Sequence, residues 1–186
     1  MKILVIDDSP WNIASAVETL ASHDVVTVDN IEQARRVLLE KPKFDAVLTD
    51  LWMPRGEFSG DGAISTRHAP KMDADSQIPA GLVFAIKASN LGIKTVICTD
   101  SDHHRDWICS LLDLVGLVSL SENPKWARGD SHQRIAYVEA RCASMSARWE
   151  DNKIIPCGSS DMNESQTIKD WGRAMKSSGL FTELQD

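Results

Sequence analysis

Residues 2–9 read KILVIDDS and residues 44–54 read FDAVLTDLWMP, and these two stretches decide the fold class. Each is a short β-branched and aliphatic run that ends in aspartate, which is typical of a strand buried on both faces of a parallel sheet. Similar runs at 25–28, 94–98 and 115–120 predict three further strands. The sequence therefore predicts a parallel sheet of five strands.

Amphipathic segments lie between these strands. Ser9-Pro10 and Asn30 have the residue types that begin helices, with proline at the first helical position. Apolar residues also recur at helical spacing in four later segments, which are 79–90, a segment from 101 or 102 onward, 131–149 and 164–177. Alternating strands and helices predict a doubly wound α/β fold, in which ligands bind at the carboxyl ends of the strands.

Composition excludes several classes of function. The 186 residues are 42% hydrophobic and carry a net charge of -7, so we expect a globular protein that does not bind nucleic acid non-specifically. No apolar run reaches the roughly 18 residues of a membrane span, and Asp7 comes too early for a signal peptide. The four cysteines form no C-x-x-C pair, which predicts neither a zinc site nor a disulfide framework. We therefore expect a cytoplasmic protein.

Two regions interrupt the alternation of strands and helices. Residues 55–78 are polar and far exceed the usual 2–6 residues, roughly, of a βα loop, so we expect a mobile or partner-binding loop. Residues 151–186 begin with a linker-like stretch and offer a last helix with Ile168, Trp171 and Met175 on one face. We therefore divide the chain into a domain at 1–150 and a C-terminal linker and helix at 151–186, which we expect to dock.

Polar residues follow the strands at the edge where a ligand is expected. Asp7 and Asp8 follow the first strand, Asp50 follows the third, and Thr99 follows the fourth. Converging carboxylates raise one another's pKa, and a hard divalent cation such as Mg²⁺ or Mn²⁺ relieves their repulsion. An aspartate beside that cation can attack phosphorus and form an acyl phosphate. Aspartates also cap helices and turns, which is the simplest alternative for each of them.

These residues give the chain a resemblance to a known family. KILVIDDS, FDAVLTDLWMP and KTVICTDS (94–101) resemble the receiver domain of bacterial response regulators, over roughly residues 1–125. The resemblance implies a flavodoxin-like sheet of order 2-1-3-4-5. It also implies phosphorylation of Asp50, a phosphoryl-binding hydroxyl on Thr99, and Mg²⁺ held by Asp7, Asp8, Asp50 and the backbone carbonyl of Trp52.

The chain departs from this family at several positions. Asp100 stands where the family has a small residue, and the loop at 55–78 is longer than usual. The family ends its fifth strand in Lys-Pro, and that lysine contacts the phosphoryl group, but Asn123 precedes Pro124 here. Lys125, two positions later, and Asn123 itself are the candidate substitutes. His103-His104 lacks a third ligand at metal-binding spacing, so a metal role for this pair is disfavoured.

The resemblance implies a stand-alone phosphoacceptor in a phosphorelay, not an enzyme beyond handling its own phosphoryl group. Its partners would be a histidine kinase or phosphotransfer protein and a downstream protein, and a homodimer is one further expectation. Asn123 and Asp100 motivate the alternative of a degenerate receiver that binds partners without phosphorylation. A Mg²⁺-dependent phosphatase is a third hypothesis. It requires a D-x-D motif with a catalytic lysine, and this is disfavoured because Trp52 occupies the position of the second aspartate.

Overall fold

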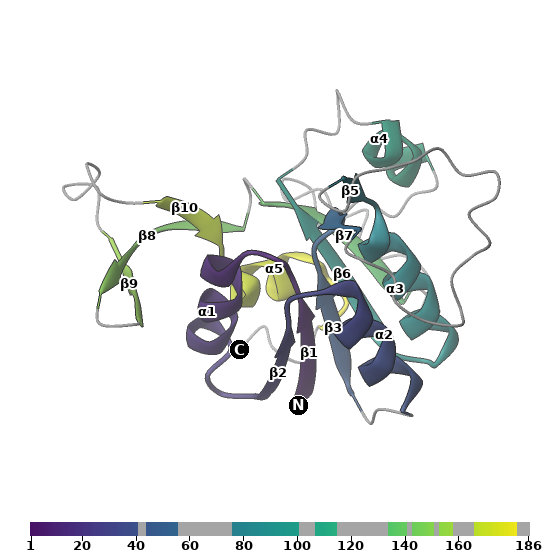
Figure 1. Ribbon diagram of the computed structural model, residues 1–186, viewed down its shortest axis with the longest axis horizontal. Coiled ribbons are helices and arrows are strands. Elements are labelled where there is room, and N and C mark those ends of the chain that lie inside the picture. The colour runs from purple at the N-terminus through teal and green to yellow at the C-terminus, as the bar shows by residue number, and fades with distance from the viewer. Residues whose placement is uncertain are drawn as a thin grey trace.

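A computed structural model describes residues 1–40, 44–55, 76–100, 107–114, 134–140, 143–150, 153–157 and 166–181 (Figure 1). Its main sheet has five parallel strands in the order β2-β1-β3-β6-β7. These strands are β1 (Lys2–Ile6), β2 (Asp24–Val28), β3 (Ala46–Thr49), β6 (Lys94–Thr99) and β7 (Ile135–Glu139). The predicted α/β class with a five-stranded parallel sheet is confirmed.

Helices cover both faces of this sheet. They are α1 (Pro10–Thr19), α2 (Ile31–Leu39), α3 (Ala80–Asn90), α4 (Trp107–Leu114) and α5 (Trp171–Ser177). Helices α1 and α5 pack on the face that presents Val5 and Leu48, whereas α2 and α3 pack on the face that presents Leu4 and Val47. Helix α4 joins α3 against Ile97, which lies on this second face. Side chains alternate along each strand, so both faces are apolar and both need a cover.

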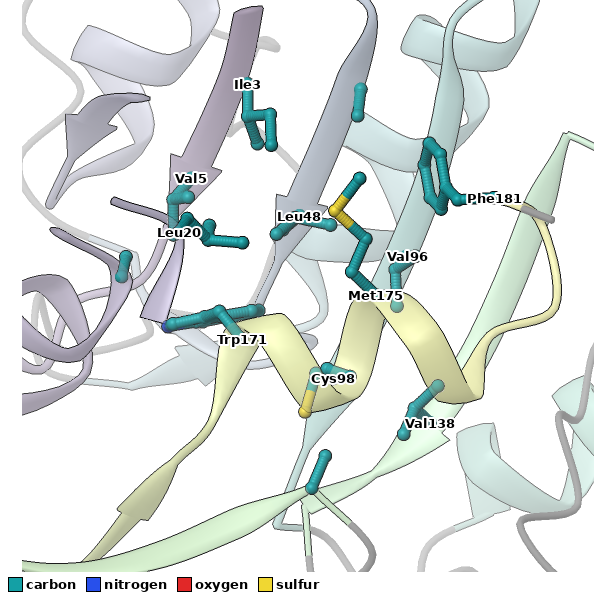
Figure 2. Close-up of a cluster of buried hydrophobic side chains, with 14 of the residues drawn as sticks. Ile3, Val5, Leu20, Leu48, Val96, Cys98, Val138, Trp171, Met175 and Phe181 are labelled. Atoms are coloured by element: carbon teal, nitrogen blue, oxygen red, sulfur yellow. The ribbon is translucent and has the colours of Figure 1, made fainter. Parts of the chain in front are cut away.

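The C-terminal helix belongs to the main core. Figure 2 shows α5 lying across the sheet, with Trp171 and Met175 directed toward β1, β3 and β6. Trp171 is fully buried, Met175 is 1% exposed, and Phe181 extends the same cluster. The predicted docking of the C-terminal segment is therefore confirmed for Trp171 and Met175, whereas Ile168 precedes the helix and packs in a separate cluster.

A second, smaller sheet lies beside α1 (Figure 1). It consists of β8 (Ser144–Glu150), β9 (Lys153–Pro156) and β10 (Gln166–Lys169), all antiparallel, in the order β10-β8-β9. The helix predicted over 131–149 is therefore wrong, because this segment forms β7 and most of β8. The final helix predicted from residue 164 begins only at Trp171, after β10.

The fifth strand of the main sheet does not come from the predicted segment. Strand β7 takes the place beside β6, with Thr95 opposite Ile135 and Thr99 opposite Glu139. Residues 115–120, where we predicted this strand, lie outside the described residues. The sequence IAYVE of β7 is apolar through its centre, and Tyr137 is fully buried, as a strand covered on both faces requires.

The two ends of the predicted loop at 55–78 are paired. Strands β4 (Met53–Pro54) and β5 (Gln77–Ile78) are antiparallel, and the Arg55 N–H donates to the Ser76 carbonyl at 3.0 Å. Met53 is fully buried, and Ile78 packs against the same cluster. The loop is therefore anchored at both ends, and residues 56–75 lie outside the described part of the chain.

Across the ranges that the structure describes, no helix combines the length and the apolar character needed to cross a membrane.

Candidate metal centre

Three carboxylates meet at the carboxyl edge of the main sheet. Asp7 follows β1 and Asp50 follows β3, and the Asp50 N–H donates to the Ile6 carbonyl at 2.8 Å, which fixes the two strand ends side by side. Together with Asp8, they offer ligand oxygens that all lie within 4.8 Å of one another. Because these oxygens come from hard, anionic ligands, the cluster fits a divalent cation such as Mg²⁺.

Asp7 is held rigidly. Its side chain is fully buried, and its Oδ1 accepts from the Ser9 N–H at 2.9 Å and from Asn12 Nδ2 at 3.0 Å. Ser9 is the N-cap of α1, as predicted, and its side chain accepts from the Asn12 N–H. The start of α1 therefore orients the Asp7 carboxylate.

A lysine from the C-terminal segment enters this site. Lys169 Nζ lies 2.7 Å from Asp7 Oδ2 and 3.0 Å from Asp50 Oδ1, and the residue is only 4% exposed. Lys169 is the last residue of β10, 162 positions after Asp7. The ammonium therefore bridges two carboxylates that the sequence alone had assigned to a metal.

Burial and charge shift the pKa values of these groups. Burial raises the pKa of Asp50 to about 6, because the nearby ammonium of Lys169 offsets the cost of desolvation only in part and Asp7 adds to it. Burial, and then the charge of Asp7, also raise the pKa of Asp8, which is less buried. Burial would lower the pKa of Lys169, but Asp7 and Asp50 outweigh it and raise that pKa above its usual value. The lysine therefore stays charged at neutral pH.

Helix α1 also fixes the backbone of Lys169. The Lys169 N–H donates to Asn12 Oδ1 at 3.1 Å, and its carbonyl accepts from the hydroxyl of Ser15, which is buried. The indole Nε1 of Trp171 donates to the Asn12 carbonyl at 2.9 Å. These contacts come from one side of α1, so the helix that orients Asp7 also places the lysine.

The edge of the site is formed by α3 and β5. The Gly81 N–H donates to the Leu51 carbonyl at 3.1 Å, and a Cβ on Gly81 would lie 1.7 Å from the Asp50 carbonyl oxygen. Glycine at this position therefore lets the start of α3 contact the backbone of Asp50. On the other side, a hydrogen bond from Gln77 of β5 lowers the pKa of Asp8 slightly against the larger effects of burial and Asp7.

The remaining predicted site residues have different outcomes. Thr99 is the last residue of β6 and is fully buried at the same edge of the sheet. Trp52 is half-buried two residues after Asp50 and packs against the cluster that contains Leu51. Asn123, Lys125 and His103-His104 lie outside the described residues. Asp100, which follows Thr99, is exposed.

Lys169 was missed because sequence reasoning looked for a lysine near residue 123. One local signal was present: Thr167-Ile168-Lys169 is a short alternating run directly before Asp170, whose side chain caps α5 by accepting from the Arg173 N–H at 2.8 Å. Asp7 stands in a similar place, between β1 and the capped start of α1. This signal was weak, because ligands in α/β folds bind at the carboxyl ends of parallel strands and β10 pairs antiparallel with β8.

The site can hold a cation and an anionic ligand together. Its carboxylates attract a divalent cation, while the ammonium of Lys169 offers a charge-assisted hydrogen bond to a negatively charged oxygen.

Comparison with models of known protein families and with curated proteins found no match for this chain.

Proposed function

We propose that this chain is a phosphoacceptor receiver that carries a phosphoryl group on Asp50. The observation that supports this most strongly is the position of Lys169 Nζ, within 3.0 Å of both Asp7 and Asp50. An aspartate at a strand end, beside a candidate metal-binding carboxylate pair and an ammonium, suits phosphoryl transfer to a carboxylate, because positive charges stabilise the phosphoryl oxygens. Lys169 would then fill the role for which the sequence offers Lys125 or Asn123 as substitutes for the family's lysine.

The fold supports the same proposal. We infer a flavodoxin-like fold, because the main sheet is parallel and has helices on both faces. Its strand order is β2-β1-β3-β6-β7, so β6 and β7 take the fourth and fifth places in the sheet. In such folds the ligand site lies at the carboxyl ends of the central strands, where Asp7 and Asp50 are found. The resemblance of residues 2–9, 44–54 and 94–101 to receivers is thus consistent with the place that these residues occupy.

The chemistry follows from the contacts of Asp50. Its Oδ1 accepts from the Leu51 N–H at 2.7 Å and from Lys169, so we assign its other oxygen, Oδ2, as the nucleophile. That oxygen forms a bond to phosphorus while the bond from phosphorus to the donor's imidazole nitrogen breaks, and the imidazole takes up a proton from solvent. Asp8 and Asp50 would hold Mg²⁺, with Asp7 and the Trp52 carbonyl contributing, and the ion would supply positive charge near the phosphoryl oxygens. Thr99 would donate to a phosphoryl oxygen.

The proposed partners follow from this reaction. A histidine kinase or a phosphotransfer protein would supply the phosphoryl group, and a further protein would receive the output in the cytoplasm. The alternative is an interaction module that never carries phosphate. The two differ in whether Asp50 accepts a phosphoryl group.

Incubation with acetyl phosphate and Mg²⁺, followed by intact-mass measurement, tests the proposal. We expect a gain of one phosphoryl group that is absent without Mg²⁺ and is removed by hydroxylamine, as for an acyl phosphate. Asp50→Asn should abolish the gain, whereas Asp45→Asn, a change at a carboxylate that accepts from the Lys2 N–H at the start of β1, should retain it. If the wild-type mass does not change with any small phosphodonor, the interaction module becomes the better account.

A further inference from the structure

The side-chain amide of Asn12 joins the acidic site to the C-terminal segment. Its Nδ2 donates to both oxygens of Asp7, at 3.0 and 3.2 Å, and its Oδ1 accepts from the Lys169 N–H at 3.1 Å. One small group therefore contacts a proposed metal ligand and the backbone of the lysine beside it.

This double contact requires an amide. A carboxylate needs a donor, and a backbone N–H needs an acceptor, so only one orientation of the amide satisfies both partners. Aspartate at this position would keep the acceptor for Lys169 but would place a second negative charge against Asp7. Alanine would remove both hydrogen bonds and leave the buried Asp7 carboxylate with fewer donors.

The backbone around Asn12 is also fixed. Its N–H donates to Ser9 Oγ at 3.4 Å within the first turn of α1, and its carbonyl accepts from the fully buried indole of Trp171. The Ser15 hydroxyl, one turn later on the same helix, holds the Lys169 carbonyl. The amide of Asn12 is therefore presented from a well-supported position between the two segments.

We infer that Asn12 is a positioning residue of the phosphoacceptor site. It holds the Asp7 carboxylate and the Lys169 backbone at a fixed separation, so that the ammonium lies between Asp7 and Asp50. The importance of this role for the reaction rests on the proposed function. The physical link between Asn12 and Lys169 can be measured without metal or phosphoryl group.

The test compares Asn12→Ala and Asn12→Asp with a matched control, Asn30→Ala. Asn30 is the N-cap of α2 and accepts from the Gln33 N–H, so its loss weakens the start of a helix on the face of the sheet opposite α1 and α5. Two signals are followed by NMR in full-length protein: hydrogen exchange of the Lys169 amide and the carboxyl carbon resonance of Asp7. Mg²⁺ affinity is then measured by calorimetry.

We expect Asn12→Ala to speed exchange of the Lys169 amide beyond any change in global stability, to shift the Asp7 resonance, and to weaken Mg²⁺ binding about tenfold, as loss of an outer-sphere partner does. Asn12→Asp should preserve protection of the Lys169 amide while shifting the Asp7 resonance. Asn30→Ala should change none of the three signals beyond its effect on global stability.

The outcomes separate the two ideas. If Asn12→Ala behaves like Asn30→Ala in both NMR signals, the positioning role is wrong, whatever the wild type binds. If wild-type protein binds no Mg²⁺ and gains no phosphoryl group, yet Asn12→Ala still releases the Lys169 amide, the proposed function is wrong and the positioning of Lys169 by Asn12 stands.

Discussion

Lys169 brings one positive charge to three carboxylates, two of which are buried. Taking such groups out of water costs several kcal/mol per ion, so a buried pair adds little net stability even with good geometry. Losing one partner is a different matter, because the remaining charges stay buried without compensation. The ion pairs of Lys169 with Asp7 and Asp50 are therefore a point at which a single substitution has a large effect.

We expect Lys169→Met to lower the free energy of unfolding by about 3–5 kcal/mol at pH 7, the usual loss when one partner of a buried pair is removed. The loss should shrink as the pH falls from 7 to 5, because burial raises the pKa of Asp50 to about 6 even with Lys169 in place, and removing the ammonium raises it further. Protonation of Asp50 then removes one of the charges that the variant leaves buried without a partner. Urea unfolding of wild type and variant at pH 5 and pH 7 measures both effects.

Lys176→Met is the matched control for this substitution. Lys176 lies in α5, close to Lys169 in sequence, but its side chain is exposed. Its loss should change stability by less than about 0.5 kcal/mol. Equal effects of the two substitutions, or a Lys169→Met loss that grows at lower pH, would contradict the assignment of Lys169 as the counter-ion of the site.

At the scale of elements, the start of α3 is the least tolerant contact of the acidic site. Gly81, the second residue of α3, lies against the end of β3. A Cβ on Gly81 would meet backbone atoms of Asp50 and Leu51, and it would lie 1.7 Å from the Asp50 carbonyl oxygen. Backbone cannot rotate away as a flexible side chain can. Either α3 or the Asp50 backbone would have to move to admit a methyl group.

Gly81→Ala is therefore expected to destabilise the protein by about 3 kcal/mol, the upper end of the usual overpacking cost, and to weaken Mg²⁺ binding by displacing Asp50. Gly92→Ala serves as the control: its φ of 81° costs alanine about 1–2 kcal/mol, but among the described residues its Cβ would meet only the Arg134 side chain, at 3.7 Å. Chemical unfolding and calorimetry on both variants check this. Undisturbed Mg²⁺ affinity in Gly81→Ala would show that the Asp50 backbone is not constrained by α3.

The elements differ in how well the sequence predicts them. Strands β1, β3 and β6 and the capped starts of α1 and α2 were predicted because each has a local signal, either a β-branched run or a Ser or Asn cap. The helix predicted over 131–149 was wrong because β7 and β8 carry apolar residues close enough together to fit a helical period as well. Pairing with β6 and β10, which no local pattern reveals, decides between the two.

At the scale of the whole molecule, the sequence predicts the part of the candidate site that follows from local strand signals and misses the part that depends on long-range packing. Asp7, Asp8 and Asp50 follow strands whose order in a parallel sheet is set by short connections, so their convergence follows from the fold class. Lys169 comes from the end of the small sheet and reaches the site only because α5 packs beside α1. A contact between residues 7 and 169 depends on that long-range packing. The sequence near Lys169 indicates a strand end before a helix cap, but it does not indicate which part of the molecule that end contacts.

The two ends of the chain share one core. Ile3 and Val5 of β1 lie in the same cluster as Trp171, Met175 and Phe181 (Figure 2). Helix α5 therefore covers part of a face of the sheet that α1 leaves open, although sequence reasoning had separated residues 151–186 as a linker and helix.

Ending the chain at residue 150 should therefore prevent cooperative folding. The truncation removes Trp171 and Met175, and loss of buried side chains of this size costs about 3–5 and 2–5 kcal/mol respectively. Together with the loss of Phe181 and of Lys169's charge, this approaches the 5–15 kcal/mol, roughly, that stabilises a typical domain. Circular dichroism during heating, with a dye that binds exposed apolar surface, measures the outcome. A chain that ends at Phe181 keeps every described contact and should unfold like the full-length protein. A cooperative transition in the 1–150 fragment would show that the domain folds without α5 and that α5 is not needed for its core.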